Sequence, residues 1–401
     1  MAATPQATCH SIRNRIQYGI QPDVHRGSDI EPEETALATA RAAAVRALPD
    51  VLHDAEALAA IGAPTGEEIQ RSAWVEDRLV GLPGRRSRDE VGNLLWTFGE
   101  EAPDVLILAH LDSVFSRDVE LSIRHSNGWL EGPGIGDNAC AVSVCMSVIE
   151  GLVADHGPLS LAVAFTVGEE GLGNLRGARA ALKELAPRRV VAVEGHGLGD
   201  VVVDAVGSVR AQIRIEGPSG HSWWDRGHPS AIHAMVEFLH ALLSEHPGVH
   251  VNVGVIEGGS GVNAIAGRCV ALVEARSVDC TALDLFEGRL GATNVEPPLH
   301  RSIEVVGRRP AGRLDPQGQL IAVVRRARRL LTLPDELGEG STDANAALAH
   351  GIPAVGLGCA VGSGMHTVNE RIDTSSVELG HAQLRLVLEL ALGLPQALPA
   401  P

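Results

Sequence analysis

Two glutamates stand side by side at the end of an apolar stretch of this chain. Glu169 and Glu170 belong to the segment GEEGLGN at residues 168–174, which follows the run LSLAVAFTV. Adjacent like charges repel each other, and an isolated pair of this kind usually occupies a solvated turn. The alternative is a division of tasks, in which one carboxylate holds a cation and the other moves a proton. The residues that end the other apolar stretches decide between these two interpretations.

Histidines and carboxylates follow the other predicted strands in the same way. They are His110 and Asp112 after DVLILA, Asp137 in the loop GPGIGDN, Glu194 after RRVVAV, and His366 beyond IPAVGLG. In open parallel sheets, ligands bind in the crevice beyond the carboxyl ends of the strands. We therefore expect these residues to converge with the two glutamates on one crevice.

Such a cluster of acids would repel itself unless cations were bound to it. A mixture of imidazole and carboxylate ligands suits zinc, and less exclusively manganese or cobalt. A carboxylate that bridges two ions about 3.5–4 Å apart is the usual core of a two-metal hydrolase. Asp112, two residues after His110, is placed to hydrogen-bond that imidazole and fix its tautomer. We expect one or two divalent ions per chain, with zinc as the first choice.

The glycine-rich loop GPGIGDN has a competing interpretation as a phosphate or dinucleotide loop. Its spacing is not GxGxxG, and no GK[ST] follows it. Asp137 also stands where an anion would have to bind. A metal-ligating loop is therefore the better interpretation.

The composition is that of an acidic globular protein. The chain has 401 residues, of which 45% are hydrophobic and 21% charged, and its net charge is −17. This charge argues against nucleic acid, whose binding needs a concentrated basic surface. No apolar run approaches the roughly 18 residues of a membrane span, and the N-terminus lacks the apolar segment of a secretory signal. Six cysteines without CxxC spacing suggest reduced thiols. We expect a cytoplasmic protein without membrane association. Its first thirty or so residues are expected to form a loosely ordered extension.

Two kinds of segment must position the site. Up to residue 205 and again from residue 313, strands rich in Val, Ile and Leu alternate with helical patterns. This alternation indicates a mostly parallel sheet covered by helices on both faces. Residues 206–312 follow the order strand, helix, strand, strand, helix, strand, which is the ferredoxin-like arrangement. The predicted fold class is α/β, with 206–312 inserted between the two parts, 1–205 and 313–401, of the first domain.

Seven motifs of the chain occur in the order seen in one family. They are AHLDSV, GPGIGDNACA, TVGEEGLGN, VAVEG, GPSGHS, VGVIEGGSGVNAI and MHTVNE. With them, the chain resembles the aminoacylase, acetylornithine deacetylase, succinyl-diaminopimelate desuccinylase and glutamate carboxypeptidase family of di-metal metallopeptidases. The resemblance runs from about Ala63 to Asp373. It implies a zinc-exopeptidase-like catalytic domain and an inserted lid or dimerisation domain.

The resemblance implies a role for each residue at the sheet edge. Glu169 is the general base that deprotonates the attacking water, which answers the question raised by the glutamate pair. The metal ligands are Asp137 as the bridge, His110 and Glu194 at one site, and Glu170 and His366 at the other. Asp112 supports this constellation, and we expect His196 to lie behind the ligands.

The resemblance also assigns residues of the inserted domain. His221, in GPSGHS, matches a histidine that stabilises the tetrahedral oxyanion, often from the partner subunit, so we expect a homodimer or higher homo-oligomer. Asn263 and Arg276 match substrate-binding residues of the family. The bidentate guanidinium of Arg276 suits a substrate carboxylate. A surface charge on a strand is the alternative for Arg276.

Two features depart from the family's pattern. GEGSTDANAA replaces a GGT-type loop, so Ser341, Thr342 and Asp343 are candidates for shaping a different pocket. Trp223 and Trp224 follow the motif GPSGHS and are either core residues or a stacking wall for an aromatic substrate.

The predicted function is hydrolysis of an amide-type C–N bond in a small N-acyl amino acid or short peptide that bears a carboxylate. In the family that the chain resembles, deacylases and carboxypeptidases tend to have Glu at the position of Glu194, whereas aminopeptidases tend to have Asp. An alternative is an aminohydrolase that releases ammonia from an activated aromatic amine, with Trp223 and Trp224 against the ring. An aminopeptidase and a metal-binding protein without catalysis are further alternatives, and the presence of Glu169 argues against the second of these.

Overall fold

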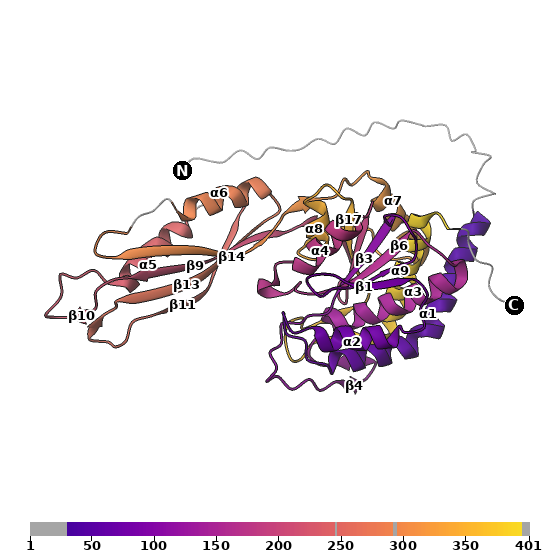
Figure 1. The fold of residues 1–401 in the computed structure, drawn as a ribbon, viewed down its shortest axis with the longest axis horizontal. Coiled ribbons are helices and arrows are strands. Elements are labelled where there is room, and N and C mark those ends of the chain that lie inside the picture. The colour runs from indigo at the N-terminus through magenta and orange to yellow at the C-terminus, as the bar shows by residue number, and fades with distance from the viewer. Residues whose placement is uncertain (1–29, 245–246, 292–294, 395–401) are drawn as a thin grey trace, which may run out of the picture.

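The computed structural model of the chain describes residues 30–244, 247–291 and 295–394. The expected N-terminal extension falls outside these residues. Figure 1 shows two lobes, a broad α/β lobe and a narrower one that extends away from it on long strands. Each lobe has its own hydrophobic core.

A nine-stranded sheet forms the centre of the broad lobe. Its order is β1-β2-β6-β3-β7-β17-β8-β15, with β16 beside β8. The strands are β1 Arg85–Arg88, β2 Leu94–Thr97, β3 Val105–His110, β6 Leu161–Thr166, β7 Val190–Glu194, β8 Asp200–Ala205, β15 Gly312–Arg313, β16 Glu336–Gly340 and β17 Ala354–Gly358. The four central strands β6, β3, β7 and β17 run parallel, which confirms the predicted α/β class.

The register of the central strands brings the candidate site residues at their ends to one edge of the sheet. Every residue of β3 is buried, because helices flank a parallel sheet and leave its strands no solvent-facing side. His110 ends β3 opposite Thr166, and Glu194 ends β7 opposite Gly358. The chain therefore leaves the core at the same edge in each of these strands.

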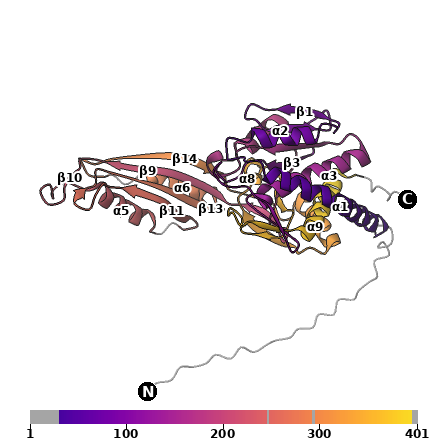
Figure 2. The ribbon, with the colours of Figure 1, turned by 90° about the horizontal axis from the view of Figure 1, so that it is seen from below.

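Helices pack around this sheet (Figure 2). They are α1 Ile30–Ala59, α2 Ile69–Arg78, α3 Ala141–His156, α4 Arg176–Leu185, α7 Gln319–Leu331, α8 Ala344–Leu348 and α9 Thr374–Leu392. The ends of α9 follow from local chemistry. The Asp373 side chain accepts the Ser375 N–H at its start, and Gly393 stops it with a left-handed φ of 62°.

The stretch Ile135–His156 is long and apolar enough to cross a membrane by length and composition alone. The sequence pattern predicts an apolar helix here but no apolar run near the length of a membrane span, and this stretch passes that test of length and composition. In the structure 67% of its apolar window is buried inside the broad lobe. It contacts α1, α9, β3 and β7 as a core helix of this lobe.

The narrow lobe has the expected strand and helix order. It comprises β9 Gly207–Glu216, α5 Ala231–Leu242, β11 His250–Gly258, β13 Arg268–Ser277, α6 Cys280–Leu290 and β14 His300–Arg309. Its sheet is antiparallel in the order β11-β13-β9-β14. The short strands β10 Gly220–His221 and β12 Ala264–Ile265 pair near its far end (Figure 1).

A small sheet was not foreseen from the sequence. It consists of β4 Arg124–Ser126, β5 Trp129–Glu131, β18 Gly362–Ser363 and β19 Arg371–Asp373. Strands of two or three residues are too short to show a periodic pattern. Because β19 pairs with β5, the loop that carries His366 is fastened beside the loop that carries Asp137.

Candidate metal centre

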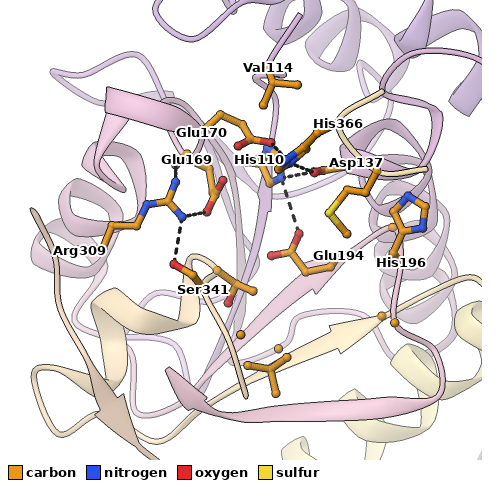
Figure 3. A pocket seen from close by; sticks show the side chains of 18 of the residues that line it. His110, Val114, Asp137, Glu169, Glu170, Glu194, His196, Arg309, Ser341 and His366 are labelled. Atoms are coloured by element: carbon orange, nitrogen blue, oxygen red, sulfur yellow. Dashed lines mark hydrogen bonds and ion pairs between the residues drawn. The ribbon is translucent and has the colours of Figure 1, made fainter. Parts of the chain in front are cut away.

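Two groups of side chains share Asp137 at the carboxyl edge of the central strands (Figure 3). His110, Asp137 and Glu194 form the first group, and Asp137, Glu170 and His366 form the second. The ligand atoms within each group lie within 4.8 Å of one another. Imidazole nitrogens mixed with carboxylate oxygens are the donor set that zinc and manganese accept. The chemistry of these donors therefore fits one or two divalent ions.

Asp137 has the geometry of a bridge. Its Oδ1 lies 2.9 Å from His110 Nε2, and its Oδ2 lies 3.0 Å from His366 Nε2. Glu194 Oε2 is 3.6 Å from His110 Nε2, and Glu170 Oε1 is 3.2 Å from His366 Nε2. Each oxygen of Asp137 thus faces a different half of the cluster. The Asp137–Asn138 peptide bond is cis.

The charges of the cluster depend on one another. Burial favours the neutral form of Asp137, yet hydrogen bonds from His110 and His366 hold its pKa well below the ordinary value. Contacts with Asp137 and Glu170 raise the pKa of His366 to about 10, and burial raises the pKa of Glu194 to about 7. Protons shared between carboxylates and imidazoles are what divalent ions displace when they bind.

Asp112 orients the neighbouring residues by a route other than the expected one. The Nδ1 atom of His110 is 3.1 Å from the backbone oxygen of Asp112 and 3.6 Å from its carboxylate. The backbone oxygen thus fixes the tautomer that leaves Nε2 free. The Asp112 carboxylate instead accepts the N–H groups of Glu169 and Glu170, at 2.9 and 2.8 Å, and the Thr65 hydroxyl at 2.9 Å.

Glu169 lies beside the candidate ligands and is paired with an arginine that the sequence patterns had not singled out. Arg309 Nη1 donates to Glu169 Oε1 at 2.9 Å and to Ser341 Oγ at 3.1 Å, and its Nη2 donates to the Glu169 backbone oxygen. Burial raises the pKa of Glu169, and the charge of Arg309 opposes that shift. The segment GRRP at the end of the narrow lobe's last strand was the available signal for Arg309.

Arg276 lines the same cavity as the metal cluster, and Ser341 and Thr342 line it as well. The cavity has a volume of about 460 Å³. Arg276 Nε donates to Glu274 Oε2 at 2.9 Å, and Arg210 Nε donates to the other oxygen of Glu274 at 2.7 Å. Arg210 and Arg276 of the narrow lobe therefore line the cavity together with the acidic cluster of the broad lobe.

His221 and Asn263 do not line this cavity in the described chain. Both are exposed and lie at the β10–β12 end of the narrow lobe, away from the broad lobe (Figure 1). The N–H groups of Trp223 and Trp224 point at His221 Nδ1, at 3.2 and 3.4 Å, which leaves the ring proton on Nε2 as a donor. The two Trp residues are 63% and 76% exposed, so the core interpretation of this pair is wrong.

The profile of the peptidase family M20/M25/M40 matches residues 106–390. A succinyl-diaminopimelate desuccinylase of Xylella fastidiosa (strain M12) is 25% identical over 333 residues, which cover 75% of this chain and 86% of the relative. The uncharacterised protein YqjE of Bacillus subtilis (strain 168) is 24% identical over 325 residues, 74% of this chain and 83% of the relative.

Solved structures share the fold. The aminopeptidase PepT from Bacillus cereus superposes with a TM-score of 0.71 at 20% identity, over 86% of this chain and 98% of that chain. The di-peptidase Dug1p from Saccharomyces cerevisiae has a TM-score of 0.70 at 14% identity, over 90% and 99% of the two chains.

Proposed function

Because the chain belongs to the peptidase family M20/M25/M40, we propose that it cleaves the amide bond of a small N-acyl amino acid or short peptide with a free carboxylate. It is a metal-dependent hydrolase of C–N bonds, as this membership and its desuccinylase relatives show. The observation that carries the finer proposal is the position of Glu169. This carboxylate is 5% exposed and lines the same cavity as the Asp137 cluster and Arg276.

The chain's residues divide the reaction between them. Divalent ions bound by His110, Asp137, Glu170, Glu194 and His366 would polarise the amide carbonyl and make water more acidic. Glu169 takes the proton of the attacking water and delivers it to the leaving nitrogen. Asp112 holds the backbone of the glutamate turn, and Arg309 holds the Glu169 carboxylate in the cavity.

The aminohydrolase alternative rested on Trp223 and Trp224. Neither residue lines the cavity of its own chain. Their N–H groups contact His221 Nδ1, so they would reach a site only together with His221 of a second copy, and the measured product separates the two activities.

A parallel assay of two products tests the proposal. The metal-loaded protein is offered N-acyl amino acids, dipeptides and an activated aromatic amine, and free amino acid and ammonia are measured in the same reactions. We expect release of the amino acid without ammonia. Ammonia without amino acid would favour the aminohydrolase, and no product from any member of the set, with both ions bound, would contradict the proposal.

The proposal includes a homodimeric assembly and a cytoplasmic location. His221 lies at the far end of the narrow lobe, so a homodimer in which a second copy supplies it would complete the site. The five cysteines within the described residues are all free. Free thiols are consistent with a cytoplasmic enzyme.

Replacing Arg276 with alanine should raise KM for a carboxylate substrate about tenfold or more, the scale of a lost charged hydrogen bond. The value of kcat should change little, because a remote carboxylate is bound equally in the ground and transition states. The measurement uses a substrate pair that differs only in free acid against amide. Arg268→Ala is the matched control, since Arg268 lies on the same strand with a 61% exposed side chain and does not line the cavity. If the Arg276 variant keeps the wild-type preference for the acid, Arg276 does not bind the substrate carboxylate.

A further inference from the structure

Glu370 is a fully buried carboxylate to which the proposed reaction assigns no task. It ends the motif MHTVNE, four residues after His366. Its Oε2 accepts the Gly134 N–H at 2.8 Å. Its Oε1 accepts the N–H groups of Gly136 at 3.0 Å and Asp137 at 2.7 Å. Both oxygens of one carboxylate thus hold the loop that presents the bridging Asp137.

The same carboxylate reaches a third segment through His196. The Nε2 atom of His196 lies 2.6 Å from Glu370 Oε1, and His196 stands two residues after Glu194. One side chain therefore connects the three segments that carry Asp137, Glu194 and His366. These segments are far apart in sequence, since Glu370 follows Asp137 by 233 positions and His196 by 174.

The chain keeps space for this imidazole. A Cβ atom at Gly136 would lie 2.3 Å from His196 Nε2, and a Cβ atom at Gly362 would lie 2.4 Å from His196 Nδ1. Any side chain at either glycine would displace the ring. His196 is only 8% exposed, so its position is set by these close neighbours and by Glu370.

A buried cation lies near this carboxylate. Arg71 is 1% exposed, and its guanidinium donates to the backbone oxygens of Ile61 and Leu111 at 2.8 and 3.0 Å. Burial lowers the pKa of Arg71 to about 10, while the charges of Asp112, Asp137 and Glu370 act in the opposite direction. Arg71 thus offsets part of the negative charge beneath the metal cluster.

We propose that Glu370 is a positioning residue that sets metal affinity by holding the Asp137, Glu194 and His366 segments in one arrangement. It acts through the backbone N–H groups of the Asp137 loop and through His196. Partners of this kind behind the ligands typically change metal affinity by about 10–100-fold when they are altered. The proposal rests on the metal site of the proposed function, but its test needs no substrate.

The test measures zinc affinity of the full chain by competition with a chromophoric chelator. Glu370→Gln keeps the size of the side chain but replaces one acceptor oxygen with a donor group. Either the single contact at Oε2 or the three contacts at Oε1 then lose their acceptor, and the negative charge that holds all four is gone. We expect zinc to bind about 10–100-fold more weakly, with an unchanged far-UV circular dichroism spectrum. Glu389→Gln is the matched control, because Glu389 is also buried, at 4% exposure, and pairs with Arg385 on α9. This control should alter thermal stability but not zinc affinity.

His196→Gln provides a second variant that leaves Glu370 in place. It should also weaken zinc binding, and the double variant should lose less than the product of the two single effects, because the residues act through one contact. Zinc affinity within twofold of wild type in the folded Glu370→Gln variant would overturn the proposal. If that variant does not fold, wild-type affinity in His196→Gln would overturn it instead. Tight zinc binding by a wild-type protein that cleaves no amide would contradict the proposed function and leave this proposal standing.

Discussion

Glu169→Gln will lower kcat by about 10²–10⁴-fold, the usual scale for the loss of a general base, while the fold and the metal content remain. Glutamine has the same size and can still accept the hydrogen bond that Arg309 donates to Glu169 Oε1. It cannot take a proton from water at neutral pH. The Asp112 contacts to the backbone N–H groups of the turn do not involve the Glu169 side chain and should persist. The measurement combines steady-state release of the amino acid with elemental analysis of the purified variant.

Glu170→Gln is the control for this prediction, because the two residues are neighbours with nearly equal burial, at 5% and 6% exposure. Glu170 Oε1 faces His366 Nε2 at 3.2 Å, whereas Glu169 Oε1 faces Arg309. The Glu170 variant should therefore lose metal, and the Glu169 variant should not. The reverse pattern would show that the tasks of the two glutamates are exchanged.

Removing the divalent ions will reduce activity to the background rate, and adding zinc will restore it. Elemental analysis should find up to two ions per chain, and His366→Ala should lose at least one. The two sites differ in access, since the His366 side chain is 51% exposed and that of His110 is 2% exposed. We expect a chelator to remove the ion near Glu170 and His366 before the ion near His110 and Glu194.

The matched control is His125→Ala. The His125 side chain is 67% exposed and pairs with Glu56 at 2.8 Å, and it belongs to neither group of ligands. This variant should keep the wild-type metal content and rate. Full activity in a preparation that contains no transition metal would contradict the metal assignment.

The sequence by itself determined the central sheet and the chemical residues at its edge. A strand that is buried on both faces must be a continuous apolar run, and the first polar residue marks where the chain leaves the core. His110 and Glu194 end their strands in this way, and the Glu169–Glu170 pair follows β6 closely. A short local pattern was therefore enough to place the proposed base and the proposed metal ligands on one edge before any distance was known.

The tertiary structure alone decided how these residues are held. Arg309 meets Glu169 across 140 positions of sequence, and Glu370 meets Asp137 across 233. No local pattern encodes such contacts, because each joins segments that are far apart in sequence. Glu370 also precedes β19, whose pairing with β5 involves strands too short to show a period. The acceptor role of the Asp112 carboxylate and the exposure of Trp223 and Trp224 were decided in the same way. A side chain's type limits the chemistry that it can do, but its partners are set by how distant segments pack.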